Sequence, residues 1–292
     1  MGKYKRDKGL QIPMEQRQKL NAKILYLVEN HEAELYGITP EDIFNVYMGN
    51  GGLHGLDRKD FQNFHAYTEA KKEVEQGQFF TPAEICEFLV ACVKPETEDI
   101  IYDLTYGKGD FFNYLPTESN IYGTEIDMKA VKIAQYLYPK ANLQYGDIRQ
   151  YSPVLSGDIV FGNPPFHLEW GTKEAPVSSQ MYYCKKAYQV LKNGGLLVLL
   201  VPESFLSDDF SNKEDIEEIN HMFNLIVQFS LPADAFKEYG VTSFRTKAMI
   251  LQKKSQYVTE RPYTTELEVL KQPQEIYQTY VLPVLPVSYT HL

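Results

Sequence analysis

The fold is decided by the stretch Asp158-Ile159-Val160-Phe161-Gly162-Asn163-Pro164-Pro165-Phe166. Its first half is a short apolar run that predicts a buried strand ending in a turn. Its second half puts a side-chain amide, two prolines and an aromatic ring at the carboxyl end of that strand, which is the edge where open α/β sheets bind ligands. Such a tetrapeptide could grip a planar amine, or it could be an Asn-Pro turn with a phenylalanine in the core. Taken alone, it leaves both interpretations open.

The segments around this stretch alternate between strand-like and helix-like patterns. Such alternation predicts an α/β fold in which a mostly parallel sheet carries helices on both faces. The expected strands are 99–104, 120–125, 142–146, 158–161, 196–201, 225–231 and 246–252, and the expected helices are 128–138, 178–192 and 213–223. We assign residues 74–254 to this domain.

Upstream of the sheet, residues 1–73 predict a small helical appendage. Residues 14–30 have apolar side chains at helical spacing. Thr39 and Pro40 are typical of an N-cap and a first helical position. A charged helix is expected over 58–75, after a break that contains Gly49, Gly51, Gly52 and Gly55.

Downstream of the sheet, residues 255–292 lose periodicity, and we expect an irregular, Pro-rich and Tyr-rich tail. The final residues, Val287–Leu292, look like translated adapter sequence. We therefore expect the chain to be a truncated piece of a longer protein.

The bulk composition excludes several classes of protein. The chain has 292 residues, 43% of them hydrophobic, which is enough to build a full core. No apolar run approaches the roughly 20 residues needed to cross a bilayer, so we expect no membrane partner. The three cysteines form no CxxC pair, which predicts buried thiols in a reducing cytoplasm and no metal site. The net charge of −10 argues against a chain that wraps nucleic acid unaided, although bases cluster in residues 1–30 and 245–254.

A loop with two glycines follows the first expected strand of the sheet and reads Asp103-Leu104-Thr105-Tyr106-Gly107-Lys108-Gly109-Asp110. Glycines let the backbone pass close to a ligand. The acid at the strand end suits a cationic group rather than a phosphate, and neither a P-loop ending nor a full GxGxxG is present. A purely structural glycine turn would explain the loop equally well.

Acidic residues end three consecutive strands of the expected sheet. Glu125 lies 22 residues after Asp103, a spacing at which an acid can accept hydrogen bonds from ribose hydroxyls. Asp147 ends the next strand and could accept from an adenine amino group. Each acid alone could be a helix cap or a loop residue, but three at one sheet edge indicate a ligand with an adenosine and a positive centre. S-adenosylmethionine fits that description.

Taken in order, the motifs resemble those of the amino-methylating DNA methyltransferases that make N6-methyladenine. The resemblance covers residues 74–254 and rests on Gln78-Phe79-Phe80-Thr81-Pro82, the Asp103–Gly109 loop, Glu125, Asp147, Asn163–Phe166 and the segment from Leu231-Pro232 to Phe236. It is strongest to the group in which an FTP box precedes the cofactor loop, which includes the modification subunits of type I restriction systems. It implies a Rossmann-like class I S-adenosylmethionine-dependent methyltransferase sheet and site-specific methylation of adenine N6 in double-stranded DNA.

The resemblance also implies which residues bind the cofactor. Phe79 and Thr81 would flank its methionine part, Asp103, Gly107 and Gly109 its amino-acid end, Glu125 its ribose, Ile126 its adenine ring and Asp147 the adenine amino group, with Asn163 beside them. The loop departs from the family pattern at Leu104, Tyr106 and Lys108, where the family usually has Pro, Cys and a small residue. Locally, Thr81 predicts the N-cap of the helix that follows, with Glu84 as capping-box acid.

The tetrapeptide would then carry the chemistry. The Asn163 amide oxygen and the Pro164 carbonyl would accept the two N–H hydrogens of the target amine, and the restricted backbone of Pro164 and Pro165 would hold that carbonyl in place. Because a duplex base is inaccessible, the adenine must be flipped out of the helix.

Aromatic side chains would hold the flipped base. Phe166 is expected to stack on one face and Phe236 on the other, with Tyr239 and Phe244 as rivals for the second position. Stacking of this kind is worth about 1–3 kcal/mol per base.

Other interpretations stay open. RNA enzymes that methylate adenine N6 or guanine N2 carry the same tetrapeptide followed by His, as at His167 here, and a protein glutamine could offer its amide nitrogen to the same grip. A non-catalytic, cofactor-binding subunit of a larger complex is a further alternative. DNA recognition is expected to need a specificity, restriction or helicase partner, or a region beyond the end of this chain.

Overall fold

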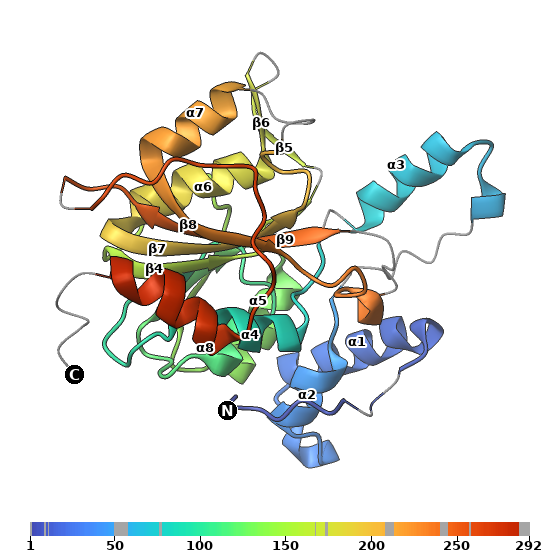
Figure 1. The fold of residues 1–292 in the computed structure, drawn as a ribbon. Helices are drawn as coiled ribbons and strands as arrows, with labels where there is room; N and C mark the ends of the chain where they lie inside the picture. Colours follow the sequence, from blue (N-terminus) through green and yellow to red (C-terminus); the bar gives the residue numbers. More distant parts are fainter. Residues whose placement is uncertain are drawn as a thin grey trace.

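A seven-stranded sheet with strand order β3-β2-β1-β4-β7-β9-β8 forms the centre of the computed structural model (Figure 1). The structure describes residues 2–8, 10, 12–49, 58–75, 78–166, 168–172, 175–207, 213–239, 245–256 and 258–285. The strands of this sheet are β1 (Ile101–Asp103), β2 (Ile121–Glu125), β3 (Asn142–Tyr145), β4 (Gly157–Gly162), β7 (Leu191–Pro202), β8 (Phe223–Ser230) and β9 (Thr246–Lys253).

The sheet is mostly parallel. The pairs β1–β2, β2–β3, β1–β4 and β4–β7 are parallel, whereas β9 runs antiparallel to both β7 and β8. The carboxyl ends of the parallel strands therefore meet along one edge. The predicted α/β class with a mostly parallel sheet is confirmed.

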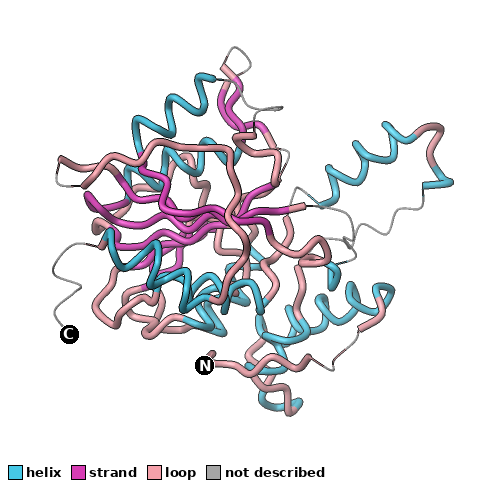
Figure 2. Tube along the Cα trace, in the orientation of Figure 1, coloured by secondary structure: helices cyan, strands magenta, loops and turns pink. Residues whose placement is uncertain are grey.

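Helices cover both faces of the sheet (Figures 1 and 2). Helices α4 (Ala83–Val93) and α5 (Met128–Leu137) share one hydrophobic core, and α6 (Ser179–Val190) and α7 (Lys213–Met222) share the other. In β4 the side chains alternate, with Ile159 and Phe161 in the first core and Val160 in the second. Burial on both faces explains why these strands are continuous apolar runs.

The N-terminal residues form helices as predicted. Helix α1 spans Met14–Glu29, α2 spans Pro40–Val46 and α3 spans Phe64–Glu75. The α2 cap is a capping box, because the Thr39 hydroxyl accepts from the Asp42 N–H at 3.1 Å and the Asp42 carboxylate accepts from the Thr39 N–H at 2.8 Å. Helices α1 and α2 pack against α5, whereas α3 stands away from the sheet in Figure 1.

Some of the sequence-based predictions concern residues outside the described part of the chain. Gly51, Gly52 and Gly55 of the expected break, His167, Phe244 and the segment 287–292 all lie in the gaps. The domain boundaries at 73 and 254 stay predictions.

The C-terminal residues contain more regular structure than we expected. Helix α8 (Pro273–Ile276) continues into a π-helical turn (Tyr277–Val281) and a 3-10 turn (Leu282–Val284). Ile276 and Val281 are buried in the core that contains α4. This segment gives no apolar periodicity because only a few of its side chains face the core.

A short antiparallel hairpin, β5 (Glu169–Gly171) with β6 (Pro176–Ser178), separates β4 from α6. Among the described residues, no helix is long and apolar enough to cross a membrane.

Candidate functional site

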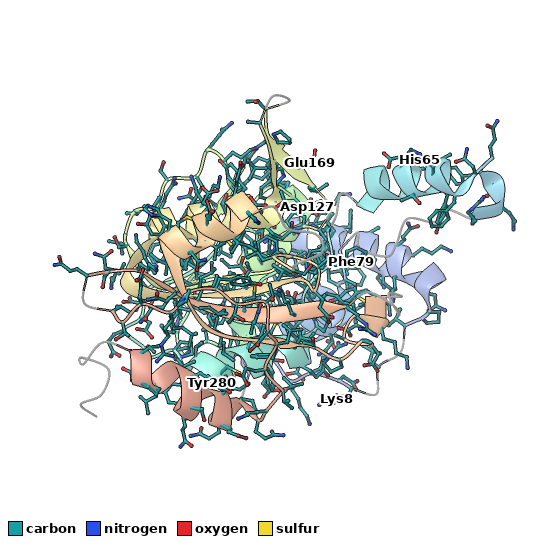
Figure 3. The ribbon with its side chains drawn as sticks, turned by 45° about the horizontal axis from the view of Figure 1, so that its top comes forward. Lys8, His65, Phe79, Asp127, Glu169 and Tyr280 are labelled. Carbon is teal, nitrogen blue, oxygen red and sulfur yellow. The ribbon has the colours of Figure 1, made fainter. Side chains whose placement is uncertain are left out.

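A cleft of about 240 Å³ lies at the carboxyl edge of the parallel strands. Nine of the residues singled out from the sequence line it, namely Phe79, Thr81, Asp103, Gly107, Glu125, Ile126, Asp147, Asn163 and Pro165. Gly109, Pro164, Phe166 and Phe236 do not belong to its lining. Phe79 and Asp127, which both line the cleft, are labelled near the middle of Figure 3, with Glu169 of β5 above them.

At one end of the cleft the Asn163 side-chain amide is held in a single orientation. Its Nδ2 donates to the Phe79 carbonyl at 3.0 Å and to the Thr81 hydroxyl at 3.1 Å. A backbone carbonyl can only accept, so the amide nitrogen has to face Phe79. No described donor reaches the opposite atom, Oδ1, which is left as an acceptor.

The hydrogen bond to Asn163 also corrects a prediction about Thr81. The N-cap residue of α4 is Pro82, and no side chain caps that helix end. The Thr81 hydroxyl serves a side chain that lies 82 residues away in the sequence. The predicted capping role of Thr81 was wrong, and its contact with Asn163 takes that place.

The two prolines between Asn163 and Phe166 are fixed from below by α6. The Pro165 carbonyl accepts from the Ser179 hydroxyl at 2.6 Å and from the Gln180 amide at 3.2 Å. No described donor reaches the Pro164 carbonyl. The Pro165 carbonyl is thus engaged by α6, while the Pro164 carbonyl can still accept a hydrogen bond from a ligand.

Asp103, at the end of β1, is a buried carboxyl at the floor of the cleft. Its Oδ1 accepts from the Thr105 N–H at 3.1 Å. Burial, together with the neighbouring acids Glu125 and Asp110, raises the pKa of Asp103 to about 8, although hydrogen bonds from Thr105 and Tyr183 lower it. A cationic ligand group beside it would reverse this shift.

Tyr183 of α6 supports this strand end, and sequence reasoning missed it. Its hydroxyl accepts from the Leu104 N–H at 3.0 Å, donates to the Phe161 carbonyl and lies 3.4 Å from Asp103 Oδ1. Gly162 allows this approach, since a Cβ there would lie 2.4 Å from the Tyr183 ring. One hydroxyl therefore ties the ends of β1 and β4 together.

Glu125, at the end of β2, fixes the glycine loop. Its Oε2 accepts from the Gly107 N–H and its Oε1 from the Asp127 N–H, both at 2.8 Å. Gly107 has a φ of +57°, and a Cβ there would lie 2.8 Å from the Phe80 ring, so glycine is required on both grounds. Burial raises the pKa of Glu125. Each carboxylate oxygen keeps acceptor capacity for a ligand.

At the other end of the cleft Asp147 is paired with Arg149. The Arg149 Nε lies 2.8 Å from Asp147 Oδ2, and the Arg149 N–H donates to Oδ1 at 2.8 Å. The hydrogen bonds from Arg149 lower the pKa of Asp147. The guanidinium is half exposed and lines the cleft.

The β5–β6 hairpin forms a wall next to this pair. Leu168 and Trp170 line the cleft, and the Trp170 ring makes an edge contact with Tyr182 of α6 at 5.6 Å. Sequence reasoning missed Arg149, Leu168 and Trp170. The one tryptophan of the chain, placed a few residues after Phe166, was the available signal.

The two aromatic residues expected to stack on a target lie beside the cleft and touch each other. The Phe166 and Phe236 rings are 6.4 Å apart at 74°, an edge-to-face contact, and both are buried. Tyr239 is also buried and lies 6.4 Å from Phe236. In this arrangement the two rings pack on each other rather than facing across a slot.

Comparison with known proteins places the chain among methylases. The family described as N-6 DNA Methylase matches residues 61–261. The methylase subunit of the type I restriction enzyme StySJI from Salmonella typhimurium is 23% identical over 255 residues, which cover 72% of this chain and 48% of the relative. The type II methyltransferase M.CvrRI of a Paramecium bursaria Chlorella virus is 24% identical, over 70% of this chain and 56% of the relative. The chain spans about half the length of the type I subunits it matches.

Solved structures share the fold. A candidate class I S-adenosylmethionine-dependent methyltransferase from Listeria monocytogenes superposes with a TM-score of 0.56 at 17% identity, covering 91% of this chain and 99% of that one. The predicted methyltransferase sheet is confirmed.

Proposed function

Because this chain belongs to the N-6 DNA methylase family, we propose that it transfers a methyl group from S-adenosylmethionine to the N6 amino group of an adenine in DNA. Family and fold imply S-adenosylmethionine as the methyl donor. The observation that carries the proposal is the Asn163 amide, whose nitrogen is held by Phe79 and Thr81 so that its oxygen is reached by no donor among the described residues.

The cleft suits this cofactor in charge and in shape. The buried Asp103 carboxyl would take its cationic amino group, because such a partner offsets the cost of burying a charge. Glu125 would accept from the ribose hydroxyls with the acceptor capacity that Gly107 and Asp127 leave it. Ile126 is an exposed apolar side chain at the cleft and offers a face for the adenine ring.

The residues of the tetrapeptide would activate the target amine. An exocyclic amine of adenine is a poor nucleophile because its lone pair is delocalised into the ring. Asn163 Oδ1 and the Pro164 carbonyl would accept its two N–H hydrogens and move the nitrogen toward tetrahedral geometry. The cofactor, when bound, supplies an electrophilic methyl group. The nitrogen becomes acidic once methylated and can lose its proton to water, so positioning and electrostatics supply the acceleration.

Holding the target base would require a change around Phe166. The base has to leave its duplex to reach Asn163, and the Phe166 ring is now in edge-to-face contact with the Phe236 ring. We propose that the base enters by separating these two rings, with Phe166 stacking on one of its faces.

Recognition of a DNA sequence would come from outside the described catalytic fold. The net charge of −10 disfavours tight binding to a phosphate backbone by this chain alone. The similar StySJI protein is a subunit of a type I restriction enzyme and is about twice as long as the matched region. A further region or a partner subunit would then provide the basic surface.

The test is expression in a host that lacks adenine methylation, followed by mass spectrometry of its DNA, ribosomal RNA and protein after labelling with methyl-labelled methionine. N6-methyladenine in DNA is expected with the wild-type chain and is expected to disappear with Asn163→Ala. Asn120→Ala is the matched control, because its amide donates to the Thr97 carbonyl on the surface.

The other outcomes identify the alternatives. Label in ribosomal RNA or in a protein glutamine would replace DNA as the substrate. Retained cofactor binding with no methyl transfer to any of the three would make the chain a non-catalytic cofactor-binding subunit. Undiminished methylation by Asn163→Ala would overturn the proposed role of that amide.

A further inference from the structure

A buried lysine projects from the glycine loop away from the cleft. Lys108 is 5% exposed, and burying a cation is costly unless it is paired. Its ammonium donates to the Phe44 carbonyl at 2.6 Å and lies 3.3 Å from the Asp110 carboxylate. It also lies 4.8 Å from the centre of the Phe44 ring.

The partner of Lys108 belongs to the N-terminal helices. Phe44 lies in the last turn of α2, where backbone carbonyls lack helical partners. The N–H that would normally reach this carbonyl is that of Met48, and it donates to the Asn21 side chain instead, at 3.1 Å. A cation at a helix carboxyl end also interacts favourably with the helix dipole. Lys108 therefore supplies the hydrogen bond that the Phe44 carbonyl lacks at the end of α2.

A second contact joins the same two regions. The Phe80 ring lies between the glycine loop and the residues after α2, because a Cβ on Gly107 or on Gly49 would lie 2.8 Å or 2.6 Å from it. Its ring centre is 6.2 Å from that of Tyr47. The N-terminal region is therefore packed directly behind the backbone that Glu125 holds.

The N-terminal region also holds the segment that contains Phe236. The Arg6 guanidinium pairs with the Glu238 carboxylate and donates to the Asn45 carbonyl at 3.3 Å. Arg17 of α1 donates to the Glu238 carbonyl. The N-terminal region thus contacts both the glycine loop, through Phe44 of α2, and the proposed target-base segment, through Arg6 and Arg17.

We propose that Lys108 is a positioning residue, which anchors the loop Thr105–Asp110 on helix α2 and so makes the N-terminal helices part of the cofactor site. With the loop anchored, the Gly107 N–H stays on Glu125, and the two acids that would receive the cofactor keep their places. Coupling is reciprocal, so cofactor in the cleft should stabilise the docking of α2. This inference rests on the proposed function.

Asp110 makes the connection to the cleft. It lines the cleft on one side and pairs with Lys108 on the other. Burial raises the pKa of Asp110 to about 6, and the charge of Lys108 opposes that rise. Loss of the cation would leave a buried carboxyl without its partner at the edge of the cofactor cleft.

The experiment compares Lys108→Met with Lys132→Met in the whole chain, using S-adenosylhomocysteine as the probe. Lys132 of α5 is the matched control because it too joins an N-terminal helix to the sheet domain, pairing with Glu29 of α1 at 2.6 Å, but on the exposed surface. Lys108→Met is expected to weaken probe binding by about 10-fold, within the usual range of coupling between sites. Lys132→Met is expected to leave it unchanged. The KM for the cofactor should rise in Lys108→Met while kcat at saturation changes little.

Hydrogen exchange of the wild-type chain gives a second readout that needs no variant. The probe should slow exchange of the α2 amides as well as those of the loop. Unchanged probe affinity in a folded Lys108→Met, or protection that stops at the loop, overturns the inference and leaves the proposed function standing. A wild-type chain that binds no probe overturns both.

Discussion

At one end of the cleft the Asn163 amide is held by two partners, while at the other end the Asp147 carboxylate lies near the surface and is already paired with Arg149. At the Asn163 end, the amide oxygen, which no donor in the described part of the chain reaches, is already oriented before a ligand binds. At the second end a ligand would have to compete with an ion pair of the chain itself. The difference follows the demands of methyl transfer, since a small displacement of reacting atoms costs far more than a loose contact to a distant nucleoside.

The largest effect is expected from Asn163→Ala. The substitution removes the proposed acceptor that becomes stronger in the transition state, and loss of one such preorganised group typically lowers kcat by about 10²–10³-fold. Cofactor affinity should change little. Single-turnover methylation and probe titration measure the two quantities separately.

An equal loss of kcat and of cofactor affinity in Asn163→Ala would break the comparison. It would mean that Asn163 organises the whole cleft rather than the reacting end. Asn120→Ala serves again as the control for removal of an asparagine amide.

Asp103→Asn tests the role of the buried carboxyl at the floor of the cleft, between the Asn163 end and the Asp147 end. Because the pKa of Asp103 is raised to about 8, the carboxyl is mostly protonated at pH 7, and binding of a cationic amino group should release about one proton. Titration calorimetry in buffers of different ionisation enthalpy measures that release. Asn at this position should release none and should weaken binding by about 10-fold or more, the usual value of a hydrogen bond to a charged group.

The same raised pKa has a consequence for folding of the ligand-free chain. Between the ordinary pKa of an aspartate and about 8, the unfolded chain is ionised at this residue while the folded chain is not. Stability should therefore fall as the pH rises through this window. Thermal melts of wild type and Asp103→Asn should converge at low pH and diverge toward pH 8, and parallel curves would contradict the assignment.

A smaller effect is expected from Thr81→Val. The isosteric change removes one of the two acceptors that orient Asn163 and leaves the Phe79 carbonyl in place. One neutral hydrogen bond is worth about 0.5–1.5 kcal/mol, so kcat should fall by a few-fold to about 10-fold. A fall in cofactor affinity without a fall in kcat would mean that Thr81 binds the cofactor rather than orienting Asn163. Thr117→Val is the control, because the Thr117 hydroxyl makes its hydrogen bond with Ser119 at the surface.

The fold and the cleft floor could be predicted because their signals are local. Strand ends, the spacing from Asp103 to Glu125 and the N-cap at Thr39 can each be read from short segments of the sequence. Acids at the ends of parallel strands meet because the sheet topology brings those ends together. The sequence pattern predicts the position of a residue correctly when that residue acts at the end of its own strand or helix.

The parts that could not be predicted depend on distant partners. The residue type and position of Thr81 are typical of an N-cap, but its hydroxyl accepts a hydrogen bond from Asn163, 82 residues away in the sequence. Tyr183 contacts Leu104, directly after β1, from 79 residues away in the sequence, and Lys108 contacts Phe44 of α2 from 64 residues away. No local pattern distinguishes these side chains from ordinary core or surface residues, so only the packed structure identifies them.

The smallest effect is expected from Arg149→Ala. Whether cofactor affinity rises or falls in this variant distinguishes two roles for the Asp147–Arg149 pair. The pair with Asp147 is exposed on the arginine side, and such pairs are worth about 0–1 kcal/mol. If Asp147 accepts from the adenine amino group, removing Arg149 frees that carboxylate, and the cofactor should bind up to about 5-fold more tightly. If the guanidinium itself contacts the nucleoside, binding should weaken instead. Trp170 lines the same end and is the chain's one tryptophan, so its fluorescence can follow the titration. Tighter binding would show that this end is restrained by its own ion pair, while weaker binding would make Arg149 rather than Asp147 the residue that reads the nucleoside.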